Sequence, residues 1–76
     1  MIIVDDRESR SGVPDKLKGE WEYNHLKIGD YVIPKTGICI ERKEGGDFIS
    51  SANNGRLFEQ INRMTDAYDH PILLIE

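Results

Sequence analysis

Short apolar runs, separated by polar and glycine-rich segments, set the pattern of this chain. The segment Met1–Asp5 carries three β-branched residues in a row and ends in acids, which predicts a buried strand. Glu20–Leu26 alternates imperfectly between apolar and polar residues, so it predicts a second strand with one face in water. Two further runs, 31–33 and 38–42, flank the turn residues 34–37 and together predict an antiparallel hairpin.

Helical patterns occur in the spaces between these strands. Val13–Lys18, with a proline near its start and a glycine after its end, predicts a short helix, and another is expected around Asp47–Ser51. From Arg56 onward apolar residues recur at helical intervals, and this longer helix is expected to end near Asp69. The polar and small residues of 6–12 predict a loop.

The apolar run Ile72–Ile75 is unbroken, which is typical of a strand buried on both faces of a mixed sheet. Strands and helices therefore alternate along the chain. This order predicts an α/β fold, with a mixed central sheet and flanking helices.

Size and composition limit the classes of protein that fit. A chain of 76 residues forms one domain, and 38% hydrophobic with 32% charged residues suits a folded unit rather than a disordered tail. The apolar runs are too short to cross a bilayer or to form a signal-peptide core. We therefore expect an intracellular protein with no membrane contact, cytoplasmic in a prokaryote or archaeon and nuclear in a eukaryote. The single cysteine, Cys39, excludes an internal disulfide and a cysteine cluster for zinc.

The formal net charge of −4 argues against tight unaided binding to nucleic acid, because that affinity comes largely from Lys and Arg near phosphates. A carboxylate cluster that holds divalent cations would give the same net charge. The positions of the acids therefore decide between these two interpretations.

The predicted hairpin brings two of these acids together. If the turn closes with Ile33 opposite Ile38, then counting back along both strands places Asp30 opposite Glu41. Residues directly opposite lie with Cβ atoms about 5 Å apart, and like charges there are destabilising unless a positive charge lies between them. A divalent cation would fit between the two carboxylates.

Side-chain alternation adds a lysine to this pair. Glu41 and Lys43 point to one face of the strand, while Arg42 points to the other. Oxygen ligands without nearby cysteines favour Mg²⁺ or Mn²⁺, which activate water and neutralise phosphate charge in phosphoryl transfer. The ammonium of Lys43 would stabilise added negative charge. Taken alone, an E-x-K pattern is more often a surface ion-pair cluster, so the wider motif matters.

The whole stretch resembles the GDXnERKX3D signature of the XPF-type (archaeal Hef-like) structure-specific endonucleases. It is formed here by Gly29-Asp30, Glu41-Arg42-Lys43 and Asp47. Two other marks of that family stand in the same order, a VDxRE segment at Val4–Glu8 and a GRLxxQ segment at Gly55–Gln60. The resemblance covers nearly the whole chain.

This resemblance implies a restriction-nuclease-like core that hydrolyses branched DNA, such as flaps, forks and bubbles, with Mg²⁺ or Mn²⁺. It implies that Asp30 and Glu41 are metal ligands and that Lys43 is the catalytic lysine. The remaining matches are Glu8 and Asp47 as further acidic positions of the site, Arg42 and Arg7 as positions that support the site or meet phosphate, and Arg56 and Gln60 on the GRLxxQ motif.

Arg56, Gln60 and Arg63 share one polar stripe of the predicted helix. Such a stripe is commonly a solvated face. The family motif favours contact with the DNA backbone for Arg56 and Gln60, and leaves the role of Arg63 open.

The chain also departs from the family pattern. Members usually continue beyond the position of Glu76 with elements that supply a dimer surface, and many carry a DNA-gripping helix-hairpin-helix pair. Residues 1–76 are therefore expected to be a single nuclease domain that is incomplete relative to the family. We expect weak, salt-sensitive binding of branched DNA, and a homodimer or partner subunit stays open. The alternative functions are a non-catalytic binding module of the same fold and a metal-stabilised structural domain.

Overall fold

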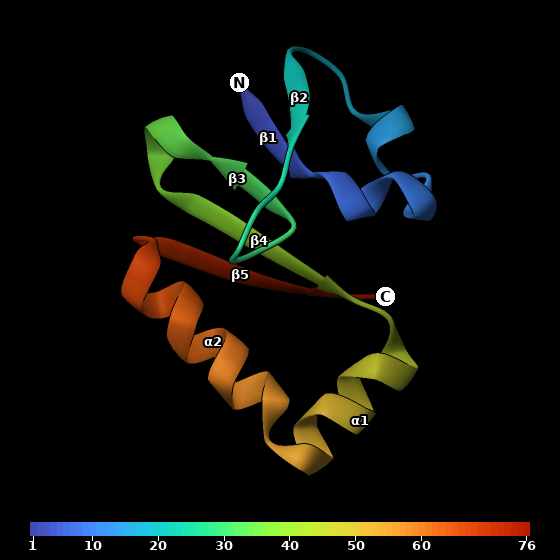
Figure 1. Cartoon of the computed structure of the whole chain (residues 1–76), viewed down its shortest axis with the longest axis vertical. Coiled ribbons are helices and arrows are strands. Elements are labelled where there is room, and N and C mark those ends of the chain that lie inside the picture. The colour runs from blue at the N-terminus through green and yellow to red at the C-terminus, as the bar shows by residue number, and fades with distance from the viewer.

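A mixed five-stranded sheet organises the computed structural model, which describes residues 1–76 (Figure 1). Its strand order is β2-β1-β3-β4-β5. The strands are β1 (Ile2–Asp5), β2 (Trp21–Asn24), β3 (Tyr31–Ile33), β4 (Ile38–Lys43) and β5 (His70–Ile75). The β1–β2 and β4–β5 pairs are parallel, and the β1–β3 and β3–β4 pairs are antiparallel. The predicted α/β class with a mixed central sheet is confirmed.

The β3–β4 hairpin has the predicted register. Val32 pairs with Cys39, and Tyr31 pairs with Ile40. The turn is a single 3-10 turn, η3 (Pro34–Thr36), which ends at Gly37 with φ of 71°. A proline at the start and a glycine in the left-handed region at the end are the residues such a tight reversal requires.

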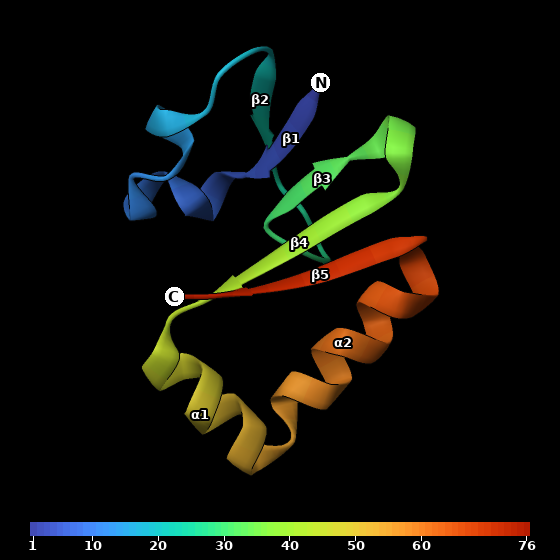
Figure 2. The same ribbon diagram turned by 180° about the vertical axis from the view of Figure 1, so that it is seen from behind.

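Two α-helices follow the hairpin, α1 (Gly45–Asn54) and α2 (Arg56–Ala67). They are separated at Gly55, whose φ of 84° breaks the helical path as the Asn-Gly pair suggests. Seen from behind, α1 and α2 lie on the β4–β5 side, while the N-terminal segments lie beside β1 (Figure 2). No helix of this protein combines the length and the apolar character that a membrane span requires.

The N-terminal connections are more regular than the sequence suggests. The expected loop at 6–12 is the 3-10 helix η1 (Asp6–Ser11), because the side chain of Asp5 caps it by accepting a hydrogen bond from the Arg7 amide. The helix expected at 13–18 is reduced to the 3-10 turn η2 (Pro14–Lys16), since Leu17 is already extended.

The prediction that the last strand is buried on both faces is wrong. β5 has only β4 as a neighbour, and Ile72, Leu74 and Ile75 are 44–48% exposed. An unbroken apolar run predicts a strand that is covered on both faces, but it does not show whether the strand lies in the centre or at the edge of the sheet. β5 is therefore an edge strand of the sheet formed by residues 1–76.

The small core lies between the sheet and α2. Val32, Cys39 and Met64 are buried there against one another, with Ile3, Leu26, Ile28 and Tyr68 packed around them. Met64 fixes the rotation of α2, so the residues of that helix just before it face the open end of the hairpin. This packing positions the site described next.

Candidate active site

Two carboxyl groups meet at the open end of the β3–β4 hairpin. Asp30 directly precedes β3, and Glu41 lies in β4. Burial raises the pKa of Asp30, and burial together with repulsion from Asp30 raises the pKa of Glu41 to about 7. A protonated Glu41 can donate a hydrogen bond to Asp30. The predicted pairing of these two acids is therefore present.

Backbone contacts hold Asp30 in this place on both sides. Its amide donates to the carbonyl of Ile40 at 2.8 Å, and its carbonyl accepts from the amide of Asp5 at 2.8 Å. Its carboxylate oxygen Oδ2 accepts from the backbone amide of Arg42 at 2.8 Å. The acid is thus fixed between β1 and β4, and one of its oxygens already has a donor.

Gly29 is required at the position before Asp30. Its φ is 82°, in the left-handed region that favours glycine. A Cβ atom there would lie 2.3 Å from Sγ of Cys39, the residue that fills the core beneath it. In the Gly-Asp pair of the signature, Gly29 therefore provides a backbone conformation that favours glycine, and Asp30 provides the carboxylate of the site.

Lys43 lies beside the acid pair, on the same face of β4 as Glu41. Its Nζ is 3.9 Å from Oε2 of Glu41. Both side chains are largely buried, with exposed fractions of 13% and 14%. The strand alternation predicted for these residues therefore holds, and the site combines two carboxylates with one ammonium.

Arg42 and Glu8 form a separate pair that does not line the cleft. Oε1 of Glu8 accepts from Nε of Arg42 at 2.8 Å and from the hydroxyl of Tyr31 at 2.8 Å. The hydrogen bond to Glu8 is the main cause of the raised pKa of Arg42. By alternation, Tyr31 and Arg42 point away from Glu41, so Glu8 acts on the acid pair only through its charge.

Asp5 and Arg7 form a clamp on the loop between β2 and β3. Oδ1 of Asp5 accepts from the amide of Leu26 at 2.9 Å, and Nη2 of Arg7 donates to the carbonyl of Leu26 at 2.9 Å. Burial alone would raise the pKa of Asp5, but hydrogen bonds from Arg7 and the Leu26 amide lower it. Asp5 also lies near Asp6 and His25, in a possible ligand cluster. Both Asp5 oxygens already have donors, which argues against that cluster.

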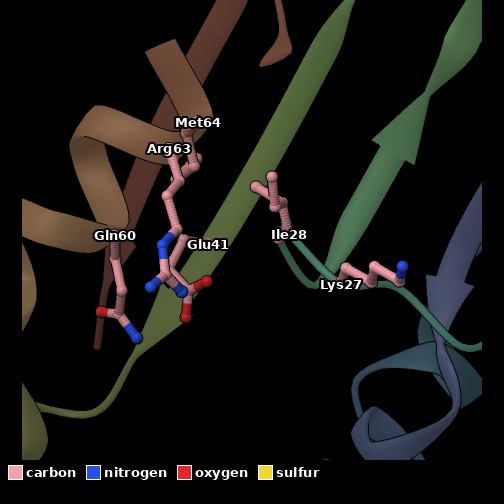
Figure 3. A pocket seen from close by; sticks show the side chains of 7 residues that line it. Lys27, Ile28, Glu41, Gln60, Arg63 and Met64 are labelled. Atoms are coloured by element: carbon pink, nitrogen blue, oxygen red, sulfur yellow. The ribbon is translucent and has the colours of Figure 1, made fainter. Parts of the chain in front are cut away.

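An open polar cleft of about 270 Å³ lies over the acid pair, and it is lined entirely by polar residues and glycine. They are Asp5, Arg7, Lys27, Gly29, Asp30, Glu41 and Gln60. A smaller pocket of about 90 Å³ shares four of these residues and adds Ile28, Arg63 and Met64. Figure 3 shows Gln60 and Arg63 reaching from α2 toward Glu41, with Lys27 on the loop opposite.

The structure brings some predicted residues into this cleft and leaves others outside. Arg7 and Gln60 line it, and their contact with DNA stays a prediction. Asp47 and Arg56 are exposed, and no hydrogen bond or ion pair joins their side chains to the acid pair. Lys27 was not identified from sequence, and its place two residues before the Gly-Asp pair was the only signal that could have pointed to it.

The groups present fit a hard divalent cation. Asp30 and Glu41 are close, half-buried and mutually repelling, a state that a cation between them would relieve. Oε1 of Gln60 is buried without a hydrogen-bond donor, but it points away from Glu41, toward which the amide nitrogen is directed (Figure 3). The two carboxylates therefore supply the ligands, and carboxylate oxygens are what Mg²⁺ and Mn²⁺ prefer.

Comparison with known proteins agrees with this arrangement. The ERCC4 domain matches residues 4–76. The DNA repair protein rad16 of Schizosaccharomyces pombe is 46% identical over 80 residues, and the 3'-flap repair endonuclease Xpf of Saccharolobus solfataricus is 40% identical over 78. The solved structure of XPF from Aeropyrum pernix in complex with DNA superposes with a TM-score of 0.87 at 36% identity.

The matches cover this chain almost completely but only part of each relative. They span 99% of the chain for both curated relatives and 97% for the solved structure. The shares of the other proteins are 9% for rad16, 33% for the archaeal Xpf and 38% for the solved chain. The chain thus corresponds to one conserved segment of these longer proteins.

Proposed function

Since this chain belongs to the ERCC4 domain family, we propose that it carries the metal-dependent nuclease chemistry that hydrolyses phosphodiester bonds in branched DNA during repair or recombination. The observation that supports this most directly is the half-buried Asp30–Glu41 pair with Lys43 3.9 Å from Glu41. A surface ion-pair cluster would not place two repelling carboxylates together where water only partly reaches them.

Asp30 and Glu41 would hold Mg²⁺ or Mn²⁺. Bound there, such an ion supplies Lewis acidity and neutralises negative charge at the phosphodiester. Other contacts within the chain hold the two carboxylates in position for the ion. The Arg42 amide fixes one oxygen of Asp30, and the core beneath Cys39 fixes the strand that carries Glu41.

Lys43 would stabilise the negative charge that develops on the phosphate. Hydrolysis adds water to phosphorus, breaks one P–O bond to a sugar oxygen and transfers a proton to that leaving oxygen. Negative charge builds on the phosphoryl oxygens in the transition state, and a fixed ammonium at low exposure stabilises it more than bulk water does. The 3.9 Å separation of Lys43 Nζ from Oε2 of Glu41 supports this role, because it places the ammonium beside the acid pair.

The proposal that branched DNA is the substrate rests on the family match and on the residues that line the cleft. Arg7 and Gln60 line the cleft and would contact the sugar-phosphate backbone, and Arg56 would join them from the exposed start of α2. The net charge of −4 predicts weak binding that falls steeply with salt. A function on DNA would place the protein in the cytoplasm of a prokaryote or archaeon, or in the nucleus of a eukaryote.

Cleavage of labelled flap or fork DNA with Mg²⁺ or Mn²⁺ tests the proposal. Lys43→Ala should lower the cleavage rate by roughly 10²-fold or more while the protein stays folded. Lys35→Ala, in the turn at the far end of the hairpin, removes the same charge and should have little effect. DNA binding without cleavage in both wild type and Lys43→Ala would instead identify a non-catalytic module.

If Mg²⁺ raises the melting temperature but branched DNA neither binds nor is cut, the domain is structural. The enzyme proposal would then be wrong.

A further inference from the structure

Two cationic side chains at the cleft and at the smaller pocket beside it, Lys27 and Arg63, have no ion-pair partner within the chain. Lys27 lines both the cleft and the smaller pocket beside it, and Arg63 lines the smaller pocket. Neither takes part in an ion pair, although acidic residues outnumber basic residues in the sequence by 14 to 10. An unpaired cation that flanks a carboxylate site is available to an incoming anion.

The backbone that carries Lys27 is held firmly. Both backbone groups of Leu26, the residue before it, are engaged by the Asp5–Arg7 clamp. Two residues beyond Lys27, Gly29 packs against Cys39. The Cα of Lys27 is therefore fixed relative to Asp30, while its side chain remains exposed. Because the Cα of Lys27 is fixed while its ammonium is free, this side chain suits contact with a phosphate at a set distance from Asp30 and Glu41.

Arg63 is fixed by its own neighbour. Met64 is 2% exposed and packs against Val32 and Cys39, so the rotation of α2 about its axis is set at that point. Arg63 therefore projects toward the smaller pocket that Glu41 also lines, and Figure 3 shows Lys27 on the loop opposite. Its guanidinium can contact two oxygens of one phosphate.

We propose that Lys27 and Arg63 form two phosphate-binding positions, one on each side of the Asp30–Glu41 pair, that hold the backbone of a single nucleic-acid strand across the cleft. The inference rests on the proposed function and deepens it, since these contacts would set the path of the cut strand. Each position would contact a different phosphate, because Arg63 extends from α2 and Lys27 from the loop opposite (Figure 3).

The salt dependence of DNA binding tests these positions. Fluorescence anisotropy of a labelled fork DNA is followed over a NaCl series for the wild type, Lys27→Ala, Arg63→Ala and the charge-matched control Lys35→Ala. Each cleft substitution should lower the slope of log affinity against log salt by about 0.7–0.9, the value for one lost phosphate contact. The double variant should lose the sum of the two, and Lys35→Ala should keep the wild-type slope.

A backbone-neutral DNA series identifies which phosphate each side chain contacts. Single methylphosphonate linkages are placed in turn on either side of the cleavage position. The wild type should lose affinity at one linkage on each side. Lys27→Ala should show no further loss at one of them, and Arg63→Ala none at the other, because the same contact cannot be lost twice.

The outcomes separate this inference from the proposed function. If the wild type binds and cuts DNA while both cleft variants behave like Lys35→Ala, the phosphate positions are refuted and the nuclease proposal stands. If both variants respond to the same linkage, the two-sided path is wrong. If the wild type neither binds nor cuts DNA, both proposals are overturned. Thermal melting confirms that each variant is folded.

Discussion

The hydroxyl of Tyr31 donates a 2.8 Å hydrogen bond to the carboxylate of Glu8, across a sequence separation of 23 residues. Tyr31 is 6% exposed and Glu8 8%, so water does not compete for this bond. The bond ties the 3-10 helix η1 to the hairpin that carries the acid pair. Removing this bond therefore tests how much the contact between η1 and the hairpin contributes to the free energy of unfolding.

Replacing Tyr31 with Phe removes this bond and keeps the ring in the core. We expect a loss of unfolding free energy of about 1–2 kcal/mol, since Glu8 loses a donor while remaining buried. Urea unfolding measures it. Tyr23→Phe on the exposed edge strand β2 is the matched control and should change little. Equal stability of the two variants would contradict the role of the bond.

Arg42→Met should be more harmful than Tyr31→Phe. It leaves the Glu8 carboxylate, whose side chain is 10% exposed, without its cation. Breaking a buried pair from one side costs about 3–5 kcal/mol, a large share of the stability of a domain this size. Adding Glu8→Leu removes the unpaired charge and should recover much of the loss. A double variant as unstable as Arg42→Met alone would show that packing, and not charge, dominates.

The acid pair should make the metal-free protein less stable as pH rises. The pKa of Glu41 is about 7 in the native state against an ordinary value of 4.5, so native Glu41 keeps a proton that the unfolded chain has lost between these values. Stability therefore falls across this range, by more than about 1 kcal/mol. The raised pKa of Asp30 acts in the same direction.

Unfolding measured from pH 4.5 to above 7 in the presence of a chelator tests this prediction. Glu41→Gln should flatten the profile, whereas the exposed Asp15→Asn should not. Adding Mg²⁺ at the upper end should restore stability to the wild type and not to Glu41→Gln. A wild-type profile that rises over this range would refute the repulsion within the half-buried pair.

Gly29→Ala should be destabilising for two separable reasons. Its φ of 82° disfavours a side chain, and the new Cβ would lie 2.3 Å from Sγ of Cys39. Gly12→Ala provides the control, because Gly12 has a similar φ of 76° but no atom within 4 Å of the added Cβ. The difference in unfolding free energy between the two variants, expected to be about 1–3 kcal/mol, measures the clash alone.

Combining Gly29→Ala with Cys39→Ala removes the atom that clashes. The loss in the double variant should be smaller than the sum of the two single losses. Simple additivity would show that Cys39 does not set the requirement for glycine.

The hairpin and its acid pair could be predicted because both follow from local rules. A four-residue turn fixes the register, and the alternation of side chains then places Glu41 and Lys43 together. The break at Gly55 before the long helix was predictable for the same reason, since an Asn-Gly pair is a local signal of a turn or loop.

What could not be predicted depends on contacts between distant segments. The edge position of β5 is set by which strands pair, and an apolar run alone does not reveal that. The pairing of Glu8 with Arg42 joins residues 34 positions apart, so the motif showed an acid near the site but not the cation that holds it. Lys27 enters the cleft only because the Asp5–Arg7 clamp folds its loop there.

Arg42 serves both faces of the sheet at once, since its amide holds Asp30 on one side and its guanidinium holds Glu8 on the other. A slip of β4 by a single position would send the Glu41 carboxylate and the Lys43 ammonium behind the sheet and bring the Arg42 guanidinium into the cleft. Such a shifted strand would lose both contacts of Arg42, so this one residue favours the alignment that keeps Glu41 next to Asp30.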